Sequence, residues 1–342
     1  MDYDEVVRFV QGHCTDGLVL VIGSGLSCAE GVPGMPAIAT HLAEHAASLD
    51  GPDGEVWKTI NAALDRGDGL ESALLKHPPS PSLEEWIVKE TCALLVPTEL
   101  RVMSEVLAGA RILRLTDFLL RVLKPASGLP ILTPNYDRLI ELACEMAGFH
   151  VDTTTTGQYA GTFDHESSCM GSWKGIKARG KMTVLEHFPR AVVLKPHGSF
   201  DWYRTSGAPR RCCLDIAGER LIITPGLNKY KAGYSAPFDK HRDLANDHIK
   251  KAARLLIVGY GFNDDHLQTH LLTRITDGTP TLIVTRGAGT TAIQLAKSAP
   301  RCVCLSKASA WDGCAIATKD TEFEHQGPNI WDIGILAKEL LA

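Results

Sequence analysis

The stretch VLVIGSGLSCAEGVPG, from Val19 to Gly34, is the strongest indication of the fold in this sequence. Its aliphatic start shows no alternation, which is typical of a parallel strand covered on both faces. The run breaks at Gly23-Ser24-Gly25 and then continues with a pattern that predicts a helix. Such a turn either lets the backbone approach a dinucleotide pyrophosphate at a helix N-terminus, or is a tight turn without a ligand. Cys28 replaces the third glycine of GxGxxG, which argues against an ordinary dehydrogenase.

The rest of the chain alternates between short apolar runs and helical patterns. The sequence predicts further strands at 129–134, 191–195, 221–224, 254–258, 281–285 and 302–305. Alternation of this kind predicts an α/β fold with a doubly wound, Rossmann-like parallel sheet. We expect a single domain over 1–342, in which 37–125 is a helical insertion and 129–342 is the remainder of the core. In the insertion, Ser82 to Glu85 has the pattern of a capping box, and residues 151–186 have no clear assignment.

Composition excludes several classes of protein. The net charge of the 342 residues is −5, from 35 basic and 40 acidic side chains, so direct nucleic-acid binding is not expected. No apolar run is long enough to span a bilayer, and the acidic start lacks a signal core, so we expect a cytoplasmic protein without a membrane contact. The ten cysteines include no CxxC pair, which argues against a zinc site of paired CxxC motifs.

Unusual residues follow four of the predicted strands. They are the glycine turn at 23–25, Asn135-Tyr136-Asp137, His197-Gly198-Ser199 and Gly259-Tyr260-Gly261. In doubly wound sheets ligands bind at the carboxyl ends of the strands, so these segments predict one shared site. Each has a simpler interpretation, since Asn135 suits a turn, Asp137 suits a helix N-cap, and an isolated histidine is usually structural. His197 is also the right kind of group for a general base near neutral pH.

Two groups of residues suggest a metal site, but neither is sufficient to predict one. Asp264-Asp265-His266 are adjacent at a helix start, and Asp264 is better interpreted as an N-cap. His41 and His45 share a helix face at i, i+4, but the glutamate of HExxH is missing because Leu42 follows His41. We interpret these two histidines as a packed or solvated face and predict no metal site.

Taken together, four segments resemble the sirtuin superfamily. GSGLSCAEGVPG resembles the sirtuin GAGxSxxxGIP loop, and TPNYD resembles TQNID. The bacterial SIR2-like branch is the closer match, because TPNYDRLIE, KPHGSFDW and GYGFND follow its usual patterns. The segments occur in order between residues 19 and 266.

The resemblance implies that NAD is the bound molecule and substrate, without zinc. It implies catalytic roles for Asn135, His197 and Asp137, with Asn135 near the nicotinamide ribose and His197 acting on a ribose hydroxyl or on water. The remaining contacts to NAD that the resemblance implies come from Gly23, Ser24, Gly25, Ser27, Pro33, Thr133, Tyr136, Ser199, Gly259, Tyr260, Gly261, Asn263 and Asp264.

The branch is known for antiviral systems in which the SIR2-like domain cleaves NAD. The resemblance therefore implies an NAD⁺ hydrolase of anti-phage defence and abortive infection, controlled by self-assembly into a homo-oligomer or by a partner such as a HerA-like ATPase or an Argonaute-type protein. The chain departs from the sirtuin pattern in two ways. The segment that reads GIPDFR in sirtuins reads GVPGMP here, from Gly31 to Pro36, and the zinc-binding cysteine pairs are missing. A deacylase or ADP-ribosyltransferase is therefore less favoured. A non-catalytic scaffold that binds NAD or ADP-ribose stays open.

Overall fold

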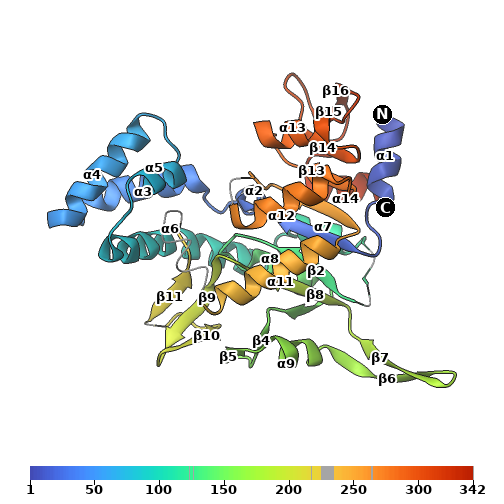
Figure 1. Cartoon of the computed structure of the whole chain (residues 1–342), viewed down its shortest axis with the longest axis horizontal. Helices are drawn as coiled ribbons and strands as arrows, with labels where there is room; N and C mark the ends of the chain where they lie inside the picture. The colour runs from blue at the N-terminus through green and yellow to red at the C-terminus, as the bar shows by residue number, and fades with distance from the viewer. Residues whose placement is uncertain (123, 126, 217, 225–234, 263–264, 342) are drawn as a thin grey trace.

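The computed structural model describes the chain except residues 123, 126, 217, 225–234, 263, 264 and 342 (Figure 1). The strands of its central sheet are β1 (Leu18–Ile22), β2 (Leu129–Leu132), β3 (His150–Asp152), β8 (Arg190–Leu194), β12 (Arg254–Val258), β13 (Thr281–Val284), β14 (Cys302–Lys307), β15 (Gly313–Ala317) and β16 (Glu322–Gln326). Their order is β16-β15-β14-β13-β12-β1-β2-β8-β3. The strands from β14 to β3 in this order run parallel, whereas β15 and β16 are antiparallel at one edge.

Helices cover both faces of this sheet, which explains the uninterrupted apolar run of β1. Leu20 and Ile22 pack into one core, and Val19 and Val21 pack into the other. The first core includes side chains of α1 (Tyr3–Gln11), α7 (Arg114–Leu119), α8 (Leu139–Met146) and α14 (Ile333–Leu340). The second includes side chains of α11 (Phe238–Lys251), α12 (Asp265–Thr276) and α13 (Thr290–Ser298). The predicted α/β fold with a doubly wound sheet is thereby confirmed.

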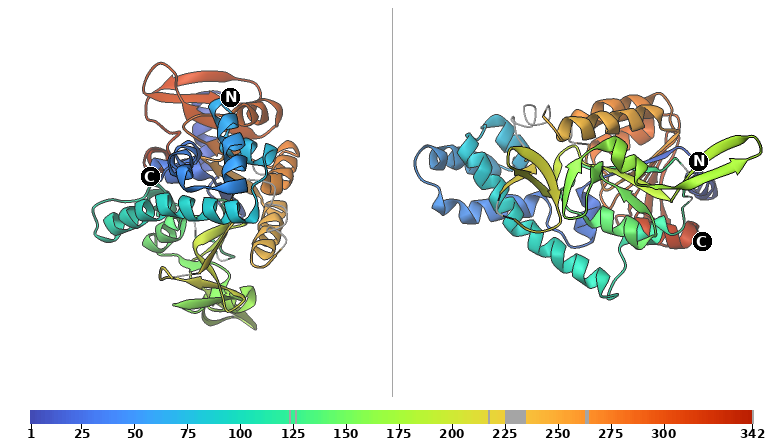
Figure 2. Two further views of the ribbon diagram at one scale, coloured as in Figure 1. Left: turned by 90° about the vertical axis from the view of Figure 1, so that its left-hand side faces the viewer. Right: turned by 90° about the horizontal axis from the view of Figure 1, so that it is seen from below.

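The segment between β1 and β2 is helical. It contains α2 (Ser24–Ala29), α3 (Met35–His45), a 3-10 turn (Ala46–Ser48), α4 (Gly51–Asp65), α5 (Leu70–Lys76), α6 (Pro81–Leu107) and α7. Helices α3 to α5 lie at one end of the long axis of the molecule (Figures 1 and 2). None of the helices in the described part of the chain combines the length and apolar character needed to cross a bilayer. The division into a core and an insertion stays a prediction.

The start of α6 differs from the predicted capping box. Ser80 is the N-cap, and its hydroxyl accepts a hydrogen bond from the Leu83 amide at 3.2 Å. The Ser82 hydroxyl instead donates to Asp53 Oδ2 on α4 at 2.5 Å. Pro81 favours this earlier start because proline suits the first turn of a helix, where its missing N–H is not needed.

Two smaller sheets occupy regions that the sequence left unassigned or misplaced. An antiparallel sheet has the order β11-β9-β10-β5-β4, and β6 pairs with β7 in a hairpin. Their bounds are β4 (Thr155–Thr156), β5 (Ala160–Phe163), β6 (Trp173–Arg179), β7 (Met182–His187), β9 (Gly198–Thr205), β10 (Ala208–Cys212) and β11 (Glu219–Ile222), and α9 (His165–Met170) lies between β5 and β6. The predicted strand at 221–224 overlaps β11, but it belongs to this antiparallel sheet and not to the parallel one, because β11 pairs antiparallel with β9. Apolar composition alone does not distinguish the two sheets.

The glycine turn after β1 packs against the glycine turn after β12. These strands are neighbours, and the Gly23 amide donates to Val258 O and the Gly25 amide to Gly259 O, both at 2.9 Å. A Cβ atom on Gly23 would lie 2.5 Å from Gly259 O, and one on Gly25 would lie 2.8 Å from Gly259 Cα. Gly259 itself has a φ of +56°, which favours glycine. Backbone packing thus accounts for the bare turn without any ligand.

We predict that Gly259→Ala lowers the free energy of unfolding by at least about 2 kcal/mol, because it combines a strained φ with a clash. The added Cβ would lie 2.7 Å from the Leu26 amide nitrogen. Gly287→Ala is the matched control, since a Cβ there meets nothing within 4 Å. Urea unfolding measures both variants, and equal stability of the two would contradict the packing argument.

Candidate active site

A pocket lies where the carboxyl ends of four neighbouring strands meet. Gly23 follows β1, Asn135 follows β2, His197 follows β8 and Gly261 follows β12, and all four line it. Its empty space is about 960 Å³, counted with the part open to solvent. The remaining lining residues are Ser24, Ser27, Val32, Pro33, Gly34, Met35, Ile38, Glu71, Leu95, Pro134, Tyr136, Asp137, Phe200, Ile223 and Tyr260.

Other predicted site residues support the pocket from behind. The Thr133 hydroxyl accepts a hydrogen bond from the backbone amide of Asn135 at 3.1 Å, and the Ser199 hydroxyl donates to Tyr136 O at 3.2 Å. Gly25 and Gly259 form the backbone contact between the two turns. Asn263 and Asp264 lie outside the described residues.

The side-chain amide of Asn135 has a defined orientation. Its Nδ2 donates to Gly23 O and to Ser27 Oγ, each at 3.0 Å. A backbone carbonyl only accepts hydrogen bonds, so the amide nitrogen, and not the oxygen, must face Gly23. Since both N–H groups are used in this way, Oδ1 is the atom of Asn135 that can accept a hydrogen bond from a ligand or a water molecule.

Asp137 completes this chain of hydrogen bonds. The Ser27 hydroxyl donates to Asp137 Oδ2 at 2.7 Å, and the Leu139 amide donates to Oδ1 at 3.2 Å. Asp137 is 4% exposed, and its carboxylate accepts from Leu139, the first residue of α8. Arg138 occupies the N-cap position, so the N-cap interpretation of Asp137 is only partly right. Asp137 therefore orients Ser27, which in turn orients Asn135.

His197 directly precedes a turn position that only glycine can occupy. Gly198 has a φ of +86°, and a Cβ there would lie 2.0 Å from Leu221 O. The Ile223 amide donates to His197 O at 2.9 Å, which links the turn to the segment after β11. The imidazole lines the pocket together with Asn135 and is 7% exposed.

Comparison with known proteins agrees with this geometry. A family model described as SIR2-like domain matches residues 130–298. Residues 130–298 are therefore similar to SIR2-like domains. The matched range contains Asn135, His197 and Gly259.

The solved structures to which the chain is similar include sirtuins. A Sir2 homologue in complex with NAD is 13% identical, with a TM-score of 0.44 and coverage of 100% of this chain and 96% of that one. A mutant Sir2 homologue in complex with ADP-ribose is also 13% identical, with a TM-score of 0.46 and coverage of 100% and 95%. A sirtuin studied for substrate affinity is 15% identical, with a TM-score of 0.42 and coverage of 85% and 90%. No curated protein matches the sequence significantly.

A buried lysine connects the Asn135 and His197 segments. Lys195, at the end of β8, is 2% exposed, and its ammonium group is 2.9 Å from Glu141 Oε1 and 3.3 Å from Ser199 Oγ. It also donates to Asp137 O. Because these contacts use all three ammonium donors, the lysine is satisfied although buried. Lys195 and Glu141 were not among the predicted site residues, although a charged residue directly after AVVL and another inside LIELAC are visible signals.

A second buried ion pair joins α6 to the same loop. Glu99, fully buried on α6, accepts from the Arg138 amide at 2.5 Å and from its guanidinium at 2.6 and 3.0 Å. Burial by itself lowers the pKa of Arg138, but the hydrogen bonds that Arg138 donates to Glu99, together with the negative charges of Glu99, Asp201 and Glu141, raise that pKa above its ordinary value. Losing one member of such a pair typically costs about 3–5 kcal/mol.

A neutral histidine supports the strand end before His197. His241 Nδ1 accepts from the Lys195 amide at 3.1 Å, so Nε2 carries the proton and donates to Thr154 Oγ1 at 2.9 Å. Burial and the Lys195 charge lower the pKa of His241 to about 3. The ring therefore holds its place without gaining a charge at neutral pH.

The helical segment contributes pocket walls that the sequence did not predict. Ile38 comes from α3, Glu71 from α5 and Leu95 from α6. These helices carry no strand-end motif, so no pattern in the sequence marked them as part of a site.

We predict that Ser27→Ala lowers the free energy of unfolding by about 1–3 kcal/mol, because it leaves a buried carboxylate oxygen and an amide N–H unpaired. Chemical denaturation compares it with Ser298→Ala, which removes an exposed hydroxyl near the end of α13. A Ser27→Ala protein as stable as the control would contradict the hydrogen-bond chain from Asp137 to Asn135.

Proposed function

We propose that this chain is an NAD⁺ glycohydrolase that produces nicotinamide and ADP-ribose. The observation that carries the proposal is the presence of Asn135 and His197 in one pocket beside the glycine turns after β1 and β12. The matched SIR2-like domain and the NAD and ADP-ribose complexes of similarly folded sirtuins point to the same ligand.

For this reaction the protein mainly has to position the ribose, the leaving nicotinamide and the attacking water. The bond between ribose C1′ and the nicotinamide nitrogen breaks, and its electron pair leaves with neutral nicotinamide. The ribose develops an oxocarbenium-like charge, and water adds at C1′ with loss of a proton. Fixed dipoles aimed at the developing charge are the largest source of catalysis in such steps.

The geometry of Asn135 suits this role. Its Oδ1 presents the negative end of the amide dipole, which stabilises positive charge on the ribose or orients the attacking water. Its Nδ2 is held by Gly23 O and Ser27 Oγ, so the dipole is oriented before the substrate binds. His197 accepts the proton of the water or of a ribose hydroxyl. Asp137 acts as a positioning residue through Ser27.

The pocket wall supports hydrolysis over protein deacylation. Gly34 and Met35 line the pocket at positions where the sirtuin GIPDFR segment has its acidic and aromatic residues. The side chains of α3, α5 and α6 close the same wall. Water needs no peptide groove, so hydrolysis is the activity least affected by these changes.

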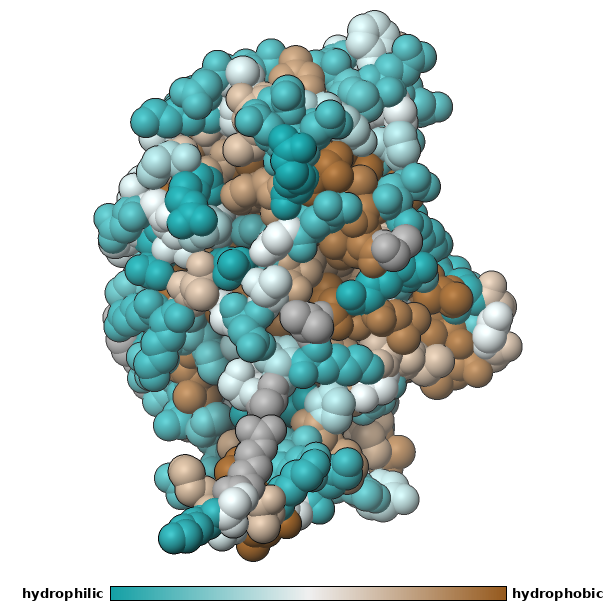
Figure 3. All heavy atoms as spheres, turned by 90° about the vertical axis from the view of Figure 1, so that its right-hand side faces the viewer, coloured by the Kyte–Doolittle hydropathy of each residue, from teal (hydrophilic) through white to brown (hydrophobic). Residues whose placement is uncertain are grey.

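We further propose that the enzyme serves antiviral defence and is controlled by self-assembly or by a partner. Large hydrophobic side chains are exposed along one stretch of the chain, with Leu107 at 67%, Ile112 at 64% and Leu120 at 54% exposure. Figure 3 shows that hydrophobic residues also gather on one face among hydrophilic ones. Exposed apolar surface of this kind is typical of interaction sites.

We expect the purified chain, alone or with a HerA-like or Argonaute-type partner, to convert NAD⁺ to equal amounts of nicotinamide and ADP-ribose. Asn135→Ala and His197→Ala should each lower turnover at least about a hundredfold, because each removes a group acting on the reacting atoms. Chromatography of the products measures both rates.

His150→Ala is the control, because that histidine is exposed on β3. Circular dichroism confirms that each variant is folded. Near-normal turnover of folded His197→Ala or Asn135→Ala would contradict the proposed roles. NAD⁺ binding without turnover under all conditions would favour a non-catalytic scaffold.

A further inference from the structure

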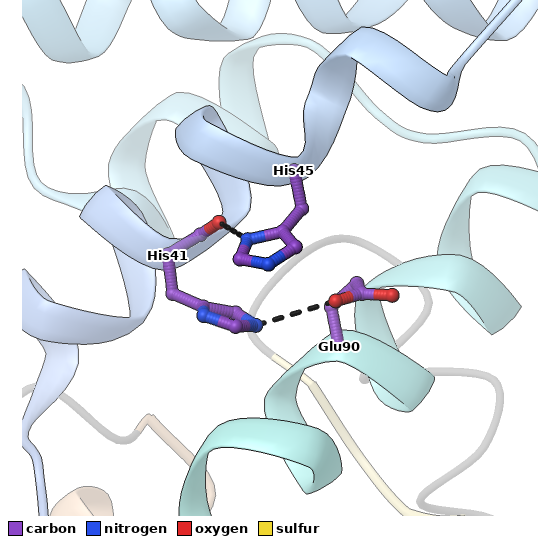
Figure 4. Close-up of side chains that lie close together, drawn as sticks. All are labelled: His41, His45 and Glu90. Atoms are coloured by element: carbon purple, nitrogen blue, oxygen red, sulfur yellow. Dashed lines mark hydrogen bonds and ion pairs between the residues drawn. The ribbon is translucent and has the colours of Figure 1, made fainter.

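Two histidines and a glutamate converge on one point between α3 and α6. His41 and His45 lie one turn apart on α3, and Glu90 faces them from α6 (Figure 4). One ligand atom from each residue lies within 4.8 Å of the others. The sequence alone placed the two histidines on one helix face but did not show the glutamate, which is 45 positions further along the chain than His45.

We propose that His41, His45 and Glu90 bind a divalent transition-metal ion, with Zn²⁺ as the best-fitting candidate. Imidazole nitrogens and a carboxylate oxygen are ordinary zinc ligands, and two histidines at i, i+4 present their rings to the same side of a helix. Three protein ligands leave the fourth tetrahedral position for water.

The spacing of His41 and Glu90 suits a shared ion. His41 Nε2 lies 3.2 Å from Glu90 Oε2. Two ligands bound tetrahedrally at zinc distances are about 3.3 Å apart. The pair can therefore hold an ion with little movement of either side chain, and the direct His41–Glu90 hydrogen bond is replaced when the ion binds.

His45 is oriented as a metal-binding histidine usually is. Its Nδ1 donates to the backbone carbonyl of His41 at 2.8 Å, which fixes the tautomer and leaves the lone pair on Nε2. Ligating histidines commonly make such a hydrogen bond with their other nitrogen. In Figure 4 the second ring nitrogen points toward the space between His41 and Glu90. The two rings are 4.0 Å apart between centroids.

Both groups of ligands belong to helices that form the pocket wall. Ile38 lies one turn before His41 on α3, and Leu95 lies on α6 beyond Glu90, and both side chains line the pocket. An ion between α3 and α6 would fix these helices against each other. The binding itself is independent of any activity of the pocket.

The test is Zn²⁺ titration of the full-length chain, purified without a histidine tag and stripped with a chelator. We expect one Zn²⁺ per chain at this site, with affinity at least about tenfold lower in His45→Ala and Glu90→Gln. His77→Ala is the matched control, because His77 ends α5 in the same group of helices without belonging to the cluster. It should bind as wild type does.

Thermal unfolding gives a second readout, since an ion that binds the folded state raises Tm. Zn²⁺ should raise the Tm of wild type and His77→Ala, and should do so less in His45→Ala. His45 is exposed, so its replacement is compatible with folding. No Zn²⁺ binding to wild type, or equal binding by wild type, His45→Ala and Glu90→Gln, would overturn the proposal.

Discussion

The contact between the glycine turns after β1 and β12 is the constraint on which the site depends. Because the strands are parallel neighbours, their ends meet, and only bare backbone allows Gly23 and Gly25 to approach Gly259 so closely. Gly23 O is thereby placed to accept from Asn135 Nδ2, which sets the direction of that amide. The backbone packing that requires glycine at these positions therefore also orients the side-chain amide dipole of Asn135 in the pocket.

Buried ion pairs connect the loop between β2 and α8 to the neighbouring helices and strands. Lys195 joins the strand before His197 to the backbone of Asp137 and to Glu141 on α8. Glu99 joins α6 to Arg138, directly after Asp137. Pairs of this kind add little net stability but are costly to break, so they favour one arrangement of the loop over others. The loop between β2 and α8 is therefore held by Ser27 on α2, by Glu99 on α6 and by Lys195 directly after β8.

Strand ends could be predicted from the sequence because apolar runs and punctuating glycines are local signals. The meeting of residues 23, 135, 197 and 261 followed from the rule that parallel strands share an edge. The walls from α3, α5 and α6, the antiparallel sheet around β9 and the role of Glu90 could not be predicted, because each depends on contacts between distant segments. Residues 221–224 show the limit, since an apolar run does not say which sheet it joins.

The most direct test of the account is a crystal structure of the full chain with ADP-ribose. We predict that the ligand occupies the pocket, with its diphosphate beside Gly23 and Ser24 and its terminal ribose beside Asn135 Oδ1 and His197. ADP-ribose bound away from these residues, or no binding at millimolar concentration in solution, would contradict it.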